Sequence, residues 1–234
     1  MSDKIKKDPP LVELENVHLD MEQSSSLASI KSVKGKYKYY HYKCDGFSDV
    51  GWGCGYRTTQ MMCSWIRNQL INEAKAASSS KIVAEVPSIL EMQKMLVDCG
   101  DKEAKFVGSK EWIGCFESCI IIDSLYDVPC KIVHCSPDQI GQHVDGIKAH
   151  LEQFGAPIGV GGDLDNASKG IIGAGCASDS ETCFLITDPH FASNKPAGKL
   201  ELFGGEWIKW ASSASFKNGS FYNFCLPQKK AFPI

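Results

Sequence analysis

The sequence predicts an α+β fold in one domain, and three observations support that prediction. The chain has 234 residues, enough for one domain with a packed core but too few for two full domains. Helical patterns come first along the chain and strand-like patterns dominate later, which favours α+β over alternating units. A glycine-rich turn leads directly into the first helical pattern, and this is where a nucleophile would be placed.

The first 30 residues are expected to form an N-terminal tail that is partly disordered, and residues 31–234 are expected to form the domain. Residues 1–10 are polar and contain Pro9-Pro10, and Ser24–Ser26 indicates a loop. Aromatic and basic residues then alternate over 34–42, which predicts a strand.

Four helices are predicted in the first two thirds of the chain. The first covers about 54–74, with a buried face made by Tyr56, Met62, Trp65, Ile66 and Leu70. The capping and stop signals around the other three predict helices over 88–98, about 112–125 and, after Ser136-Pro137-Asp138, to about 154.

Short apolar runs predict the later strands. They lie at 130–134, 157–160, 183–187 and 221–226. The glycine- and serine-rich segment 173–180 predicts a loop instead. Asp188-Pro189-His190 lies at the end of the third of these strands.

Composition and charge exclude several classes of function. The net charge is −3, from 25 basic and 28 acidic residues, so nothing favours nucleic acid or an anionic membrane as a partner. No run of eighteen apolar residues predicts a membrane span, and the polar N-terminus lacks the apolar stretch of a signal peptide. We therefore expect a cytoplasmic protein, and we expect a monomer.

The chain has eleven cysteines, an odd number, and no secretion signal, so a disulfide framework is not expected. No pair has the C-x-x-C spacing of a zinc site. Cys130, His134 and Cys135 lie close in sequence, but they follow one strand and would alternate between its faces. We therefore expect neither a metal nor a cofactor, and most cysteines should be small buried residues.

Cys54 is the candidate nucleophile. A helix N-terminus lowers a thiol pKa, and its free N–H groups can hold a developing oxyanion. We expect Gly53 and Gly55 to let a substrate backbone come close, and Gly51-Trp52-Gly53 to wall a narrow groove. The alternative is a buried structural cysteine in a tight turn, the environment expected for Cys63, Cys115 and Cys119 in helix bodies.

His190 is the candidate base among six histidines, because Asp188 stands two residues before it. An aspartate that accepts a hydrogen bond from one ring nitrogen fixes the tautomer and leaves the other nitrogen free for the thiol. Pro189 would stiffen the pair.

Together these residues carry a family resemblance. The segment Asp49–Gln60, followed by Cys63-Ser-Trp65, resembles the ubiquitin-fold-modifier-specific proteases. The resemblance spans about residues 34–228 in consistent order, and the chain is similar to the short, single-domain member of that family. Further matching segments are Tyr39–Gly46, Glu111–Gly114, Gly161–Asp163 with Ser168-Lys169, Asp188–His190 and Phe221–Gln228.

The resemblance implies a papain-like cysteine protease fold, with the nucleophile at the N-terminus of a central helix packed on an antiparallel sheet. It implies that Cys54 is the nucleophile, with His190 and Asp188 as its partners. It also implies that Tyr42 and the Cys54 N–H form the oxyanion hole. From the residues alone, Tyr42 competes equally with Tyr37, Tyr39 and Tyr40, and a core aromatic is the simpler interpretation.

The implied function is to trim the precursor of the ubiquitin-fold modifier and to remove the modifier from lysines, so the modifier is the expected partner. Three alternatives remain. A protease for autophagy modifiers shares the Gly-Trp-Gly-Cys turn, although Gly55-Tyr56-Arg57 stands where that group usually has Met-Leu-Arg. A related deubiquitinase normally carries ubiquitin-binding or zinc-finger segments upstream. A non-catalytic module that binds ubiquitin-like folds is the third.

Overall fold

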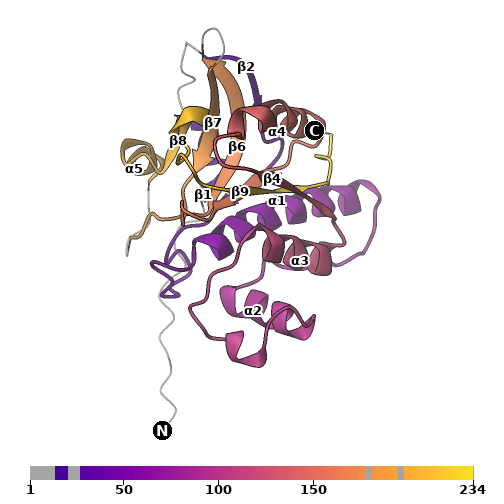
Figure 1. Ribbon diagram of the computed structural model, residues 1–234. Coiled ribbons are helices and arrows are strands. Elements are labelled where there is room, and N and C mark those ends of the chain that lie inside the picture. The colour runs from indigo at the N-terminus through magenta and orange to yellow at the C-terminus, as the bar shows by residue number, and fades with distance from the viewer. Residues whose placement is uncertain (1–13, 21–26, 178–180, 194–197, 234) are drawn as a thin grey trace.

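A computed structural model describes residues 14–20, 27–177, 181–193 and 198–233, and it confirms the α+β class (Figure 1). The helices are α1 (Cys54–Ala76), α2 (Ile89–Asp98), α3 (Cys115–Tyr126), α4 (Ile140–Gln153) and α5 (Lys199–Gly204). The strands of the main sheet are β2 (Leu27–Ser32), β4 (Cys130–Cys135), β5 (Ile158–Gly162), β6 (Lys169–Ala177), β7 (Glu181–Thr187), β8 (Ile208–Ser212) and β9 (Tyr222–Pro227).

The main sheet has seven strands, all paired antiparallel, in the order β4-β9-β5-β6-β7-β8, and β2 pairs with the far part of β6. Gly162 pairs with Tyr222, Val160 with Lys169, and Gly170 with Thr187. These pairs place the end of β5, the start of β6, the end of β7 and the start of β9 next to one another, at one end of the strands. Segments far apart in the sequence are brought together there.

Helix α1 is the central helix, lying in Figure 1 between the sheet and the pair α2 and α3. Two glycines let it approach the sheet closely. A Cβ on Gly159 would lie 3.0 Å from Met62 Cε, and one on Gly170 would lie 2.4 Å from Met61 Cε. A larger residue at either position would force the Met61 or Met62 side chain out of its place between the helix and the strands.

The expected buried face of α1 is confirmed, and burial extends further than an amphipathic stripe. Tyr56, Met62, Trp65 and Ile66 are fully buried, whereas Leu70 is half-buried. Every residue from Cys54 to Ile66 is buried. The first half of the helix is thus enclosed on all sides, while the second half reaches the surface.

The other predicted helices are present with shifted starts. Ser88 caps α2 with a capping box through Glu91, as its sequence signal indicates. Helix α3 begins at Cys115 rather than at Trp112, because Glu117 bonds back to the Gly114 N–H. Helix α4 begins at Ile140, since Asp138 adopts a left-handed φ of 61° that keeps Ser136 from capping it. In Figure 1, α4 lies on the other side of β4 and β9 from α1.

The strand predicted over 34–42 is wrong except for a short piece. Only β3 (Lys38–Tyr39) forms, paired with β1 (Leu14–Glu15). The reason is that α1 supplies side-chain partners for this backbone: Trp65 Nε1 donates to the Lys34 carbonyl at 2.7 Å, and the Lys38 N–H donates to Ser64 Oγ at 2.9 Å.

The loop predicted over 173–180 is also wrong as far as residue 177, because β6 continues to Ala177 between β2 and β7. Residues 178–180 lie outside the described part. Strands β2 and β8 and helix α5 were not predicted from the sequence.

The predicted tail contains segments that join the domain. Leu14 and Val17 are buried, and β2 begins at Leu27. Residues 1–13 and 21–26, which include the expected disordered stretch and the serine loop, lie outside the described residues.

Candidate active site

Cys54 is the first residue of α1 and is 7% exposed. The turn that precedes it is tight, because Gly51 has a φ of +85° and the Gly53 N–H donates to the Asp49 carbonyl at 2.8 Å. The first helical bond runs from the Arg57 N–H to the Gly53 carbonyl at 3.0 Å, so the N–H of Cys54 precedes the bonded ladder. The predicted position of this cysteine at a helix N-terminus is confirmed.

The two glycines beside Cys54 make room for other parts of this chain. The expectation from the sequence is instead that they make room for the backbone of a substrate. A Cβ on Gly53 would lie 2.3 Å from Asp49 Oδ2, and one on Gly55 would lie 2.4 Å from the Ile113 carbonyl oxygen. Trp52 is nearly buried, with its ring edge-to-face on Phe47 and Tyr56. The expectation that Gly51-Trp52-Gly53 walls the groove is therefore wrong.

A buried ion cluster holds this turn in place, and sequence reasoning missed it. The fully buried Arg57 donates from Nε to Asp49 Oδ2 at 2.7 Å. It also makes a two-pronged contact with Asp45, at 2.8 and 2.7 Å, and reaches Gln60 at 3.0 Å. Asp49 in turn accepts from the Lys43 N–H at 2.8 Å. An arginine within an otherwise buried helical segment is the sequence signal that could have indicated the cluster.

Asp188 and His190 directly follow β7, at the end of the strands described above. His190 Nδ1 lies 2.5 Å from Asp188 Oδ1, and the His190 N–H also donates to that oxygen at 3.0 Å. The Asp188 N–H donates to the Trp207 carbonyl at 2.7 Å. The other ring nitrogen of His190 is left for the Cys54 thiol, with which His190 shares a side-chain hydrogen bond.

Tyr42 packs against His190, with the two rings edge-to-face and their centroids 5.2 Å apart. Its N–H donates to the Pro189 carbonyl at 3.0 Å, which ties the two segments together. Its hydroxyl hydrogen-bonds the Cys54 thiol. The structure therefore brings together all four predicted residues.

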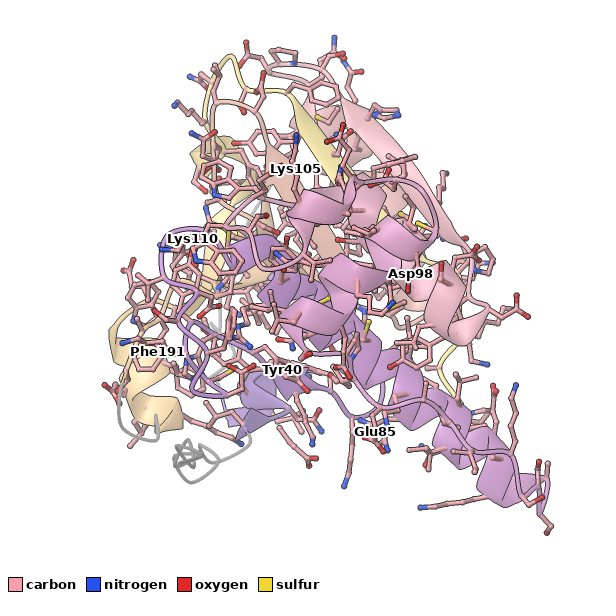
Figure 2. The ribbon with its side chains drawn as sticks, turned by 90° about the horizontal axis from the view of Figure 1, so that it is seen from below. Tyr40, Glu85, Asp98, Lys105, Lys110 and Phe191 are labelled. Carbon is pink, nitrogen blue, oxygen red and sulfur yellow. The ribbon has the colours of Figure 1, made fainter. Side chains whose placement is uncertain are left out.

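The competing tyrosines have other partners. The Tyr39 hydroxyl donates to the Asp188 carbonyl, and the Tyr37 hydroxyl pairs with His18 Nδ1 at 2.9 Å. Tyr40 is half-buried against the core. Phe191, labelled in Figure 2 and next to His190 in the chain, packs its ring edge-to-face on His41 and Trp207.

The pKa values of the thiol and the imidazole shift in opposite directions. Burial raises the pKa of Cys54, but its hydrogen bonds to His190, the Ser168 backbone and Tyr42, with the charge of His190, bring it below the usual value. Burial lowers the pKa of His190, but Asp188 and Cys54 together raise it to about 9. Both shifts favour a thiolate–imidazolium pair at neutral pH.

Ser168 is a contact that the sequence did not reveal as part of the site. Its backbone hydrogen-bonds the Cys54 thiol, and its hydroxyl donates to Thr58 Oγ1 at 3.2 Å. It lies just before β6, where the start of β6 is beside the end of β7. Ser168-Lys169 contributed to the family resemblance, but no local pattern indicated that the backbone here would face the thiol.

A groove runs away from Cys54 between the start of α3 and the end of the sheet. Its lining includes a second thiol, Cys115, whose pKa burial raises to about 12, so this thiol stays protonated. The rest of the lining consists of Trp112–Gly114, Gly161–Asp163, Asn166–Ser168, Phe221 and Asn223.

Comparison with known proteins now identifies the chain. Residues 28–225 match the model of peptidase family C78. The chain belongs to this family. It is 38% identical over 194 residues to the probable Ufm1-specific protease 1 of Drosophila melanogaster, covering 83% of this chain and 78% of that protein. It is 36% identical over 217 residues to the Ufm1-specific protease 1 of Mus musculus, covering 91% and 93%.

A structural comparison supports the same assignment. The crystal structure of UfSP from C. elegans matches with a TM-score of 0.76 and 26% sequence identity, covering 94% of this chain and 38% of that one. The fold is therefore papain-like, and this member of family C78 is a cysteine peptidase. The chain corresponds to only about a third of some longer relatives, such as the 33% of the Oryza sativa protein that it covers. Within the described residues, no helix is long and apolar enough to cross a membrane.

Proposed function

We propose that this C78 peptidase trims the C-terminus of the Ufm1 precursor and releases Ufm1 from conjugated lysines. The observation that carries the proposal is the convergence of His190, Asp188 and Tyr42 on Cys54, whose side chain lines the groove. The similarity to Ufm1-specific proteases over nearly the whole chain supports Ufm1 as the substrate. The other candidates, autophagy modifiers, ubiquitin and a non-catalytic binding module, have no comparable support.

In the proposed mechanism, the Cys54 thiolate attacks the carbonyl carbon of the modifier's C-terminal glycine. The resulting oxyanion accepts hydrogen bonds from the Tyr42 hydroxyl and the Cys54 N–H. His190, protonated in the resting pair, gives its proton to the leaving amine as the C–N bond breaks. His190 then deprotonates a water molecule, which attacks the thioester carbonyl. The glycine carboxylate leaves, and the Cys54 thiolate and the His190 imidazolium are restored.

The eleven free cysteines support a reducing compartment, because none of them is paired in a disulfide. With the net charge of −3, they are consistent with the proposal of a cytoplasmic enzyme that does not bind nucleic acid. We further propose that the enzyme acts as a monomer.

The direct test is hydrolysis of C-terminal coumarin conjugates of Ufm1, ubiquitin and an autophagy modifier, offered side by side. We expect rapid cleavage of the Ufm1 conjugate and at least 100-fold slower cleavage of the other two. A second substrate, Ufm1 joined to a lysine side chain, tests deconjugation. Preferential cleavage of ubiquitin or of the autophagy modifier would keep the peptidase and replace the substrate.

Replacing Tyr42 by phenylalanine is expected to lower kcat by roughly 10²–10³-fold, because it removes one oxyanion donor. The ring and its edge-to-face contact with His190 remain, so KM should change little. The matched control is Tyr40→Phe, a half-buried neighbour outside the site, which should retain full turnover. A Tyr42→Phe change of less than threefold would assign Tyr42 to packing alone.

The pH profile should report the thiol–imidazole pair. For an isopeptide substrate, kcat/KM should fall as pH drops below the lowered pKa of Cys54 and fall again above about 9, where His190 loses its proton. Asp188→Asn removes the main group that raises the His190 pKa. We therefore expect the alkaline limb to move to lower pH and the maximum rate to fall by roughly 10²-fold. An unchanged profile would separate Asp188 from the proton chemistry.

A further inference from the structure

Three cysteines that are distant in sequence come together behind the groove. Cys119 lies on α3, Cys130 on β4 and Cys225 on β9, and their sulfur atoms all lie within 4.8 Å of one another. Cys130 and Cys225 occupy the same face of neighbouring strands, because Cys130 pairs with Pro227, two residues beyond Cys225. Cys119 reaches them from the helix that packs on that face, with its Sγ 3.3 Å from Cys225 Sγ.

The spacing of these sulfur atoms suits a shared ion better than a disulfide. The 3.3 Å separation is well beyond a disulfide bond of about 2.0 Å, and all three thiols are free. Metal–sulfur bonds of about 2.3 Å would place the sulfur atoms of a trigonal or tetrahedral site roughly 3.8–4.0 Å apart. Small rotations of Cys119 and Cys130, which are only half-buried, would produce that spacing.

We propose that Cys119, Cys130 and Cys225 bind one thiophilic d¹⁰ metal ion. Three thiolate donors without an imidazole among them select a soft ion, either Cu(I) in trigonal coordination or Zn(II) with a solvent molecule as its fourth ligand. No short spacing motif reveals this site, because its ligands lie on three separate elements, α3, β4 and β9.

The ion would fix the wall of the groove. Cys115, one helical turn before Cys119, lines the groove, and so does Asn223, two residues before Cys225. These two are already joined, since the Cys115 thiol donates to the Asn223 carbonyl at 3.1 Å. An ion bound by Cys119, one helical turn after Cys115, would cross-link α3 to β4 and β9. It would thereby hold the contact between Cys115 and Asn223 rigid. The site is separate from the Cys54 chemistry and supplies no reacting group.

The test uses the full chain carrying Cys54→Ser, which removes the reactive thiol. The protein is first reduced and freed of metal. It is loaded with Co(II) as a spectroscopic stand-in for zinc, or with Cu(I), and then dialysed. We expect about one ion per chain, with thiolate-to-metal charge-transfer absorption in the near ultraviolet. Strong visible bands of tetrahedral Co(II) would identify the solvent-completed zinc site, and retention of Cu(I) alone would identify the trigonal site.

Two added substitutions, Cys119→Ser and Cys130→Ser, are chosen because both side chains are half-buried and tolerate a hydroxyl. Each should lower retained metal and charge-transfer absorption at least tenfold, and each should abolish the rise in Tm that the ion gives the parent. Cys99→Ser, at the exposed thiol that ends α2 and is not one of the three ligands, should change neither. Failure of the parent to retain either ion, or undiminished absorption in both variants, would overturn the proposal.

Discussion

Cys54→Ala is expected to lower turnover of a Ufm1 conjugate by roughly 10⁵-fold or more, because no other group in the site can form the thioester. The second thiol in the groove, Cys115, has its pKa raised to about 12 by burial and so cannot substitute. Single-turnover hydrolysis of the coumarin conjugate, with binding measured separately, checks this expectation. The fold and the affinity for Ufm1 should remain, since alanine fills the same small space at the start of α1.

The control for this variant is Cys99→Ala. Cys99 is the exposed cysteine at the end of α2, so it is the thiol that accessibility alone would favour for reaction. A thiol-reactive probe should label Cys54 much faster than Cys99, and Cys99→Ala should retain full activity. Equal labelling, or residual turnover in Cys54→Ala above about 1%, would remove Cys54 as the nucleophile.

Arg57→Gln is expected to lower the free energy of unfolding by about 3–5 kcal/mol, because it leaves the fully buried Asp49 carboxylate without its charged partner. Domains of this size are stable by only about 5–15 kcal/mol, so the variant should unfold at much lower urea concentration. Activity should fall as well where the variant is still folded, since Asp49 holds the turn before Cys54.

The matched control is Arg67→Gln on the same helix. Arg67 pairs with Glu85, whose side chain is 82% exposed, and exposed pairs contribute about 0–1 kcal/mol. Urea titration of both variants at neutral pH decides the comparison. A loss at Arg57 no larger than the loss at Arg67 would show that the cluster is not needed to hold the turn.

The sequence predicted the features that local chemistry determines. The glycine turn, the long helix after it and the capping box at Ser88 each depend on residues within a few positions of one another, and all are present. Asp188-Pro189-His190 was recognisable for the same reason. These are the parts of the site that sequence reasoning could place without knowing the tertiary fold.

The missed features depend on partners far away in the chain. The alternating segment 34–42 has the pattern of a strand, but α1 satisfies its backbone, and no local signal reveals that. The family resemblance singled out Tyr42, but local reasoning could not choose it over its neighbours, because its distinguishing contacts are with Pro189 and His190. Ser168 was missed because it acts through its backbone, whose direction is set by the pairing of β6.

The nucleophile and its base lie far apart in the sequence, and their order matters during synthesis. Ribosomes add about 5–20 residues per second, so Cys54 is made roughly 7–27 seconds before His190. Until β7 has paired with β6 and β8, nothing holds the imidazole beside the thiol. We therefore expect a nascent chain to become competent for proteolysis only after β6, β7 and β8 have left the ribosome and paired.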